Sequence, residues 1–155
     1  MERIKSFQID HTKLQKGLYV SRIDGDTVTY DLRMCTPNQG VYLENAALHT
    51  LEHLFATYVR VINKTFSDQI IYVGPMGCRT GFYFITRDTM SKEQVISLLQ
   101  QTFAYTAAYE GEIPGSAEAE CGNYRDHDLA GAKKIASAYG KILEGWTPEK
   151  MCYPE

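Results

Sequence analysis

His49-Thr50-Leu51-Glu52-His53 is the most informative segment of this chain, because it places two imidazoles four residues apart with a carboxylate between them. On an α-helix, positions i and i+4 lie on one face, so both rings can bind a single metal ion. The order H-x-x-E-H is the reverse of the commoner zinc-peptidase motif, which narrows the range of candidate enzymes. The segment therefore predicts a metal-binding helix.

The residues on either side of this segment have the periodicity of an amphipathic helix. From Leu43 to Ile62, apolar side chains recur at helical spacing and fall within one stripe. The stripe consists of Ala47, Leu51, Leu54, Phe55, Tyr58 and Ile62. His49 and His53 lie on the opposite side of the helix, which disfavours burial of both rings in the core. Two unrelated surface histidines remain the alternative to a metal site.

Two pairs of strands are predicted around this helix. Residues 18–23 and 27–34 flank Asp24-Gly25, which is a strong signal for a hairpin. Residues 70–73 and 81–86 form the second pair. Apolar side chains occupy every second position in the segment 27–34, so one face of the sheet is expected to be buried.

Two further helices complete the expected architecture. Ser91-x-x-Gln94 resembles a capping box that opens a helix running to about Tyr109. The last helix covers residues 129–143, and Gly145 suits its C-terminal cap. Its buried residues are expected to be Leu129, Ile135, Tyr139 and Ile142. The order ββαββαα predicts an α+β fold, in which helices pack on one face of a four-stranded antiparallel sheet.

Length and composition exclude several classes of protein. The 155 residues fit a single domain, residues 1–155, with a buried core. The net charge of −3 comes without a basic cluster, so no nucleic-acid partner is expected. No apolar run approaches the roughly 20 residues that cross a bilayer, and the N-terminal segment Met1-Glu2-Arg3-Ile4-Lys5 lacks the apolar part of a signal peptide. We therefore expect a cytoplasmic protein without a membrane partner, whose four cysteines are reduced thiols.

A catalytic metal site needs three protein ligands and an open position, so the two histidines require a third ligand. Cys121 is the leading candidate, because a thiolate binds divalent iron or zinc well and Gly122 lets the backbone turn close to an ion. Glu118 and Glu120 compete with it, since a distant glutamate completes the site in peptidases with the reversed motif. The residues alone leave this choice open, and Cys121 could also be a half-buried structural thiol.

Cys78 is the second chemically interesting thiol. It lies in the turn Pro75-Met76-Gly77-Cys78-Arg79-Thr80-Gly81, where the flanking glycines expose the turn and Arg79 could favour the thiolate. A thiolate beside a bound substrate can act as a base or a nucleophile. The alternative is a buried cysteine at the end of a strand. Cys35 and Cys152 have no such surroundings and are expected to be structural.

These segments together resemble the S-ribosylhomocysteine lyase (LuxS) family over most of the chain. Separated motifs in the same order carry the resemblance, which is far more specific than H-x-x-E-H alone. They are Ser6-Phe7-Gln8-Ile9-Asp10-His11, Asp31-Leu32-Arg33-Met34-Cys35, Pro37-Asn38, residues 49–56, residues 75–83, and Cys121-Gly122 followed by His127. The family often has Asp-Ile-Ser where this chain has Tyr72-Val73-Gly74, so substrate contacts at these positions are not carried over.

The resemblance implies a homodimer with its sites at the subunit interface, and one divalent ion per subunit. That ion is iron(II) in the cell, and zinc or cobalt can replace it. It also implies cleavage of S-ribosylhomocysteine to homocysteine and 4,5-dihydroxy-2,3-pentanedione, the precursor of autoinducer-2. By position, His49, His53 and Cys121 match the family's metal ligands, Cys78 and Glu52 its two acid/base residues, and Ser6, His11 and Arg33 its substrate contacts.

The implied reaction explains why these residue types occur together. The ion would stabilise an oxyanion, while Cys78 moves protons on carbon and Glu52 moves protons on oxygen. One alternative is a metallopeptidase that uses Glu118 or Glu120 as third ligand, with Glu52 activating water and no need for Cys78. A non-catalytic, metal-stabilised dimerisation domain is another alternative, and it would tolerate substitution of Glu52.

Overall fold

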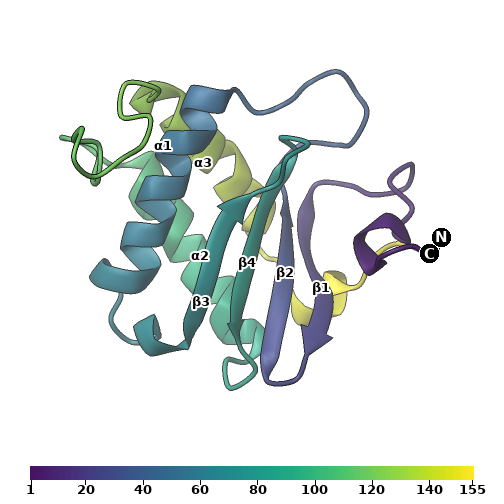
Figure 1. The fold of residues 1–155 in the computed structure, drawn as a ribbon. Coiled ribbons are helices and arrows are strands. Elements are labelled where there is room, and N and C mark those ends of the chain that lie inside the picture. The colour runs from purple at the N-terminus through teal and green to yellow at the C-terminus, as the bar shows by residue number, and fades with distance from the viewer.

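The sheet of the computed structural model, which describes residues 1–155, has four antiparallel strands in the order β1-β2-β4-β3 (Figure 1). The strands are β1 (Gly17–Asp24), β2 (Thr27–Arg33), β3 (Ile70–Pro75) and β4 (Gly81–Arg87). β2 and β4 pair at the centre, in a register that runs from Thr27 opposite Arg87 to Arg33 opposite Gly81. The predicted strand pairs are present, and the α+β fold is confirmed.

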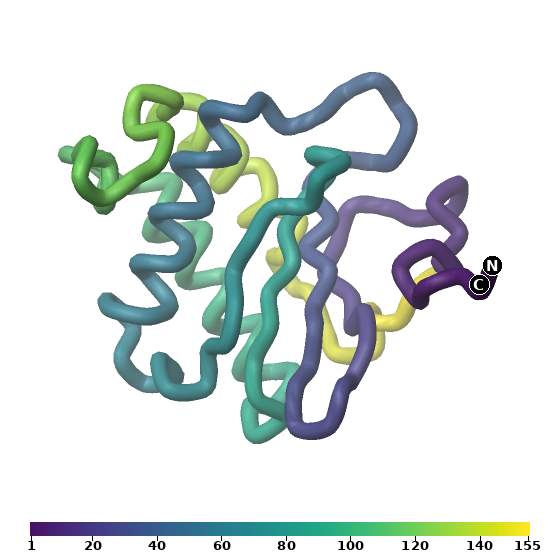
Figure 2. Tube along the Cα trace, viewed as in Figure 1, coloured from purple at the N-terminus to yellow at the C-terminus, as the bar shows by residue number.

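Three helices cover one face of this sheet. They are α1 (Asn45–Thr57), α2 (Lys92–Ala107) and α3 (Leu129–Leu143). Figures 1 and 2 show all three on one side of the sheet, with both chain termini close together near β1. The predicted capping box of α2 is present, because the Ser91 hydroxyl accepts from the Gln94 amide and the Gln94 side chain accepts from the Ser91 amide.

The core between the helices and the sheet is built around aromatic side chains. Phe55 of α1, Phe82 and Phe84 of β4, and Phe103 of α2 are fully buried. The Phe55 and Phe103 rings meet edge to face, with centroids 5.5 Å apart and planes at 78°. Burying one such side chain contributes roughly 1.5–3 kcal/mol. This cluster therefore holds α1, which carries the H-x-x-E-H segment, firmly against the sheet.

The end of the first helix differs from the sequence prediction. Residues Tyr58–Ile62 form a π-helical turn, closed by a bond from the Asn63 amide to the Tyr58 carbonyl. A π-turn adds one residue per turn and so rotates the following side chains around the axis. Val59, one turn after Phe55, is buried, and Tyr58 is half-buried and packs against the core, whereas Ile62 at the end of the π-turn is 50% exposed. The prediction was therefore wrong for Ile62, whereas Tyr58 does contact the core.

The last helix has the predicted bounds but a different buried face. Its buried residues are Ala132, Ala136, Tyr139 and Leu143. Of the four residues expected there, only Tyr139 is fully buried, while Leu129, Ile135 and Ile142 are half-buried. The small alanines let α3 approach its neighbours closely, and the larger side chains flank that contact. Ile135 and Ile142 still pack against the core from the edge of this face.

Strand β2 is buried on both faces, not on one. Its apolar positions face the helices, and its polar positions Thr29, Asp31 and Arg33 are also at most 9% exposed. Asp31 and Arg33 form an ion pair of 2.7 Å, and the hydroxyl of Tyr153 donates to the same carboxylate at 2.7 Å. The C-terminal segment therefore covers part of the outer face, a contact that no local pattern in β2 indicates.

No helix of the structure is long and apolar enough to span a lipid bilayer.

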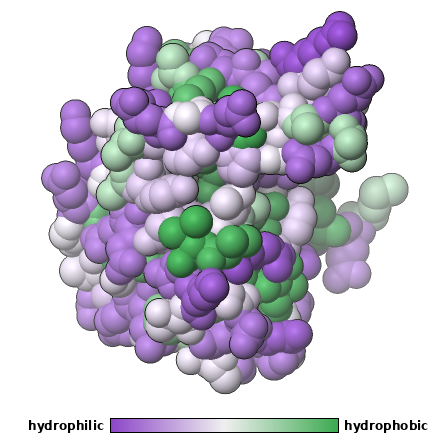
Figure 3. Space-filling view, turned by 90° about the vertical axis from the view of Figure 1, so that its left-hand side faces the viewer, coloured by the Kyte–Doolittle hydropathy of each residue, from purple (hydrophilic) through white to green (hydrophobic).

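The surface retains several exposed apolar side chains. On the face that carries α1, a hydrophobic cluster interrupts a largely hydrophilic surface (Figure 3). Large exposed apolar residues elsewhere include Ile4 and Phe7, on either side of a short 3-10 turn, and Tyr72 of β3. Apolar surface of this kind is suited to contact with another protein.

Candidate active site

Four potential metal-binding side chains converge beside α1. Ligand atoms of His49, His53, Cys121 and His127 all lie within 4.8 Å of one another. The Cys121 Sγ is 3.4 Å from the His49 Nε2, and the His49 and His53 rings stand at 89° with centroids 4.7 Å apart. The structure thus brings together the three residues that the sequence suggested as ligands.

The two helical histidines are held in the tautomer that a metal site requires. The Nδ1 of His49 lies 2.7 Å from the Asp126 carbonyl, and the Nδ1 of His53 lies 2.8 Å from the Pro114 carbonyl. A carbonyl oxygen can only accept, so each neutral ring carries its proton on Nδ1 and leaves a lone pair on Nε2. Carbonyl partners of this kind orient metal-binding histidines in many proteins. The donor set therefore fits a divalent ion such as iron or zinc.

His127 is a member of this group whose position the sequence analysis did not anticipate. Its ring stacks on His49, with centroids 4.0 Å apart and planes at 20°, and its Nδ1 is 2.9 Å from the Thr50 hydroxyl. Two nearly parallel rings cannot both point in-plane lone pairs at one ion about 2 Å away. His127 therefore supports the other ligands better than it could bind the same ion as His49. Burial and the neighbouring His49 and His53 lower the pKa of His127.

The loop that carries Cys121 is attached to α1 through backbone and hydroxyl contacts. The Asp128 amide donates to the Thr50 hydroxyl at 2.9 Å, next to the bond between His49 and Asp126. Glu118 and Glu120 are exposed, and neither belongs to the metal-binding group. The peptidase alternative needed one of these glutamates as third ligand, and their placement does not support it.

Glu52 lies on the same side of α1 as His53. Both line a cavity of about 230 Å³, together with Pro114 and Gly115. Gly115 has φ +70°, and a Cβ there would approach the His53 Nδ1 to 3.2 Å. The loop therefore packs tightly against the imidazole while leaving the Glu52 carboxylate open to a ligand.

Cys78 lines a different cavity, of about 410 Å³, at the turn between β3 and β4. Its residue is exposed, and its Sγ is 3.0 Å from the Thr80 hydroxyl. Arg79 has φ +59°, and its guanidinium donates to the Leu43 carbonyl instead of standing free beside the thiol. His11 and Arg33 line the same cavity. The side chain of Cys78 is thus accessible, as the flanking glycines suggested.

The three residues expected to contact substrate lie in different surroundings. Arg33 is 2% exposed at the base of the Cys78 cavity, and His11 reaches the same cavity with its Nδ1 bonded to the Ile9 carbonyl at 2.8 Å. Ser6 instead lines a smaller cavity of about 210 Å³ with Tyr72 and other residues. The cavities that contain Glu52, Cys78 and Ser6 have no lining residue in common.

The departure at Tyr72-Val73-Gly74 has a structural explanation. A Cβ added at Gly74 would collide with the Tyr72 phenol, which folds along the strand over that position. A large side chain at 72 and a glycine at 74 are therefore a matched pair.

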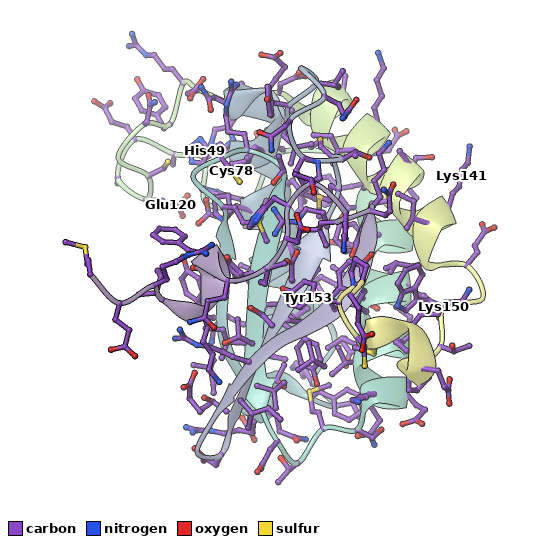
Figure 4. All side chains as sticks on the ribbon, turned by 90° about the vertical axis from the view of Figure 1, so that its right-hand side faces the viewer. His49, Cys78, Glu120, Lys141, Lys150 and Tyr153 are labelled. Atoms are coloured by element: carbon purple, nitrogen blue, oxygen red, sulfur yellow. The ribbon has the colours of Figure 1, made fainter.

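The labelled side chains show how this chemistry is distributed. His49 and Cys78 lie toward the same end of the molecule, and Tyr153 lies nearer its middle (Figure 4). One end of the fold therefore carries a thiol and imidazoles that can bind a metal ion, together with a carboxylate and a second, accessible thiol. The fold and these groups define a small α+β protein with a candidate metal centre on its H-x-x-E-H helix.

Comparison with known proteins identifies the family. The model of the S-ribosylhomocysteinase (LuxS) family matches residues 4–149. A protein of Phocaeicola vulgatus named S-ribosylhomocysteine lyase is 46% identical over 99% of this chain and 98% of its own length. Proteins of the same name from Desulfotalea psychrophila and Clostridium acetobutylicum are 46% and 40% identical, and the alignments cover at least 99% of every chain. The chain belongs to the S-ribosylhomocysteinase (LuxS) family.

Proposed function

We propose that this chain cleaves the thioether of S-ribosylhomocysteine, giving homocysteine and 4,5-dihydroxy-2,3-pentanedione, the autoinducer-2 precursor. The observation that carries the proposal is the donor set of His49, His53 and Cys121, in which both imidazoles present Nε2 lone pairs. Membership of the family and the names of the relatives support the same reaction.

The three donors would hold iron(II), with zinc or cobalt able to replace it. When bound, a divalent ion supplies Lewis acidity that stabilises negative charge developing on a substrate oxygen. The chain's own contribution is to fix the orientation of both imidazoles through their carbonyl partners, with Nε2 directed to the ion. Because iron(II) and free thiols both require reducing conditions, we place this activity in the cytoplasm.

Proton transfers would be divided between Cys78 and Glu52. Moving the sugar carbonyl twice along the chain requires removing and returning protons on carbon, which suits the accessible thiol group of Cys78. The same shifts move protons between oxygens, which suits the open carboxylate of Glu52. Each shift is internal, so no redox cofactor is consumed. The carbonyl then acidifies the neighbouring carbon, and loss of its proton expels homocysteine thiolate by β-elimination.

A homodimer would join these groups in one site. Glu52 and Cys78 line different cavities of the same chain, and His11 lies in the Cys78 cavity. The exposed Ile4 and Phe7 leave apolar surface on the N-terminal segment that a second subunit could cover. We propose that Ser6, His11 and Arg33 contact the substrate at this interface.

Solvent hydrogen exchange tests how the proton transfers are divided between Cys78 and Glu52. Substrate incubated in heavy water with iron(II)-loaded protein should gain carbon-bound deuterium, detected by mass spectrometry. In Cys78→Ala this exchange should fall by about 10²–10⁴-fold with the metal content unchanged. Glu52→Gln should also keep its metal and lose turnover. Native exchange rates in Cys78→Ala would rule out the role assigned to this thiol.

A further inference from the structure

The hydroxyl of Thr80 lies between a buried cation and the Cys78 thiol. Its Oγ1 is 2.7 Å from the Nη1 of Arg33 and 3.0 Å from the Sγ of Cys78. Thr80 itself is 2% exposed, so water does not compete for this hydroxyl. Thr80 is one residue from the start of β4, and Arg33 ends β2 opposite Gly81. Pairing of the two central strands therefore fixes this geometry.

The direction of each hydrogen bond follows from the groups involved. A guanidinium has only donors, so the Thr80 oxygen must accept from Arg33. The hydroxyl keeps one proton, and the Cys78 sulfur is its side-chain partner. A thiolate can only accept, so Thr80 donates to Cys78 when the sulfur is ionised, and this charge-assisted bond is the stronger of the two possible arrangements.

The cation behind Thr80 is held rigidly. Arg33 makes a two-pronged contact with Asp31, from Nε at 3.1 Å and from Nη2 at 2.7 Å, and Tyr153 donates to the same carboxylate. Burial lowers the pKa of Arg33, but Asp31, together with Cys78 and Tyr153, raises this pKa by more. With Nε and Nη2 both committed to Asp31, Nη1 is the group directed toward Thr80. The sequence neighbour Arg79 is directed elsewhere, to Leu43.

We propose that Thr80 is a positioning residue, whose hydroxyl conveys the charge of buried Arg33 to Cys78 and stabilises its thiolate. This inference rests on the proposed function, in which Cys78 moves protons on carbon. Without the hydroxyl, Arg33 remains in place but its influence on the sulfur is reduced to a weaker electrostatic effect through space.

The test measures the reactivity of Cys78, not turnover. Metal-loaded protein is treated with iodoacetamide at neutral pH, and labelling of the Cys78 peptide is followed by mass spectrometry. Thr80→Val keeps the shape of the side chain and removes the hydroxyl, so labelling should slow by about tenfold or more. Thr80→Ser retains the hydroxyl and should restore labelling to near the native rate. Thiolate absorbance, taken as the difference from Cys78→Ala, should fall in parallel.

Thr86→Val is the matched control. Thr86 lies on β4 and is 0% exposed, but its hydroxyl donates to the Arg87 carbonyl and not to a thiol. This variant should label Cys78 at the native rate. Thermal unfolding and metal content check that Thr80→Val is folded. If Thr80→Val is not folded, the labelling rate of Cys78 in Thr80→Ser tests the proposal instead. Native labelling in folded Thr80→Val, or slow labelling in Thr80→Ser, would overturn the proposal. Absence of lyase activity in the unmodified protein would instead overturn the proposed function, and the labelling comparison would still be informative.

Discussion

The chemistry of single side chains here depends on partners that are remote in the sequence. His49 and His53 obtain their tautomers from the carbonyls of Asp126 and Pro114, and Cys78 meets Arg33 through Thr80. The spacing of the H-x-x-E-H segment indicated two ligands, but it carried no information about these partners. The tautomer or hydrogen-bond partner of each side chain therefore depends on how the loops are placed around α1 and β4.

We predict that metal binding depends on Cys121 and not on the nearby glutamates. Cys121→Ala should lose most of its metal, because a sulfur donor 3.4 Å from the His49 Nε2 is removed. Glu118→Gln and Glu120→Gln should keep full metal content, since both side chains are exposed and outside the group. Metal analysis gives the content, and the cobalt form adds a thiolate charge-transfer band that should vanish only in Cys121→Ala. Full occupancy in that variant would contradict the assignment.

We also predict that the hydroxyl of Thr50 supports metal binding. Its buried hydroxyl bonds both the Asp128 amide and the His127 ring, and so ties the Cys121 loop to α1. Thr50→Val should lower metal affinity by about 10–100-fold, as is typical when an outer partner of a metal site is removed. Competition with a chelator measures the affinity. Thr57→Val, on the same helix, is the control and should bind metal normally.

Individual elements were largely predictable because their signals are local. The hairpin turn, the capping box of α2 and the bounds of α3 all follow from nearby residues. The π-turn after α1 was not predictable, since one extra residue per turn leaves no mark in an apolar pattern. The buried outer face of β2 also escaped prediction, because Tyr153 reaches Asp31 from the far end of the chain. In the same way His127 reaches the metal group through Thr50, and no spacing rule connects it to His49.

The contact of α3 with β1 leads to a prediction about alkaline stability. The hydroxyl of Tyr139 donates to the Gly17 carbonyl at 2.9 Å, and burial raises the pKa of Tyr139 well above 10. The native state therefore keeps a proton that the unfolded state loses as pH rises above about 10, so stability should fall there.

Melting temperatures between pH 8 and 11 measure this effect. Tyr139→Phe loses the hydrogen bond and should be less stable at pH 8 by about 0.5–1.5 kcal/mol. Its melting temperature should then decline less steeply above pH 10 than that of the unmodified chain. Tyr72→Phe is the control, because Tyr72 is 49% exposed, and its melting temperature should decline above pH 10 as steeply as that of the unmodified chain. An unchanged slope in Tyr139→Phe would show that another group governs alkaline unfolding.

At the scale of the whole molecule, the separate cavities lead to a prediction about the dimer. His11 and Cys78 share one cavity, whereas His53 and Glu52 share another. If His11 of one chain acts on the metal centre of its partner, the chain that supplies His11 must also supply Cys78. His11→Ala and His53→Ala chains, each inactive alone, should regain activity when unfolded and refolded together. In a mixed dimer, one site then contains both substitutions and the other site contains neither.

The pair Cys78→Ala and His53→Ala should behave in the same way. A mixture of Cys78→Ala and His11→Ala chains serves as the control, because each mixed dimer would have one defect in each site and stay inactive. Mass spectrometry verifies that mixed dimers have formed. Persistent inactivity of the first two mixtures, despite such dimers, would place His11 and Cys78 in the site of their own chain.

We propose that this member of the LuxS family releases homocysteine from S-ribosylhomocysteine at the centre formed by His49, His53 and Cys121. The most direct measurement incubates iron(II)-loaded protein with that substrate and follows released thiol with a colorimetric reagent. We predict steady thiol release far in excess of the protein's own four cysteines, and none from Glu52→Gln or from metal-free protein. Thiol release by the loaded protein that is no greater than in the metal-free control would contradict the account.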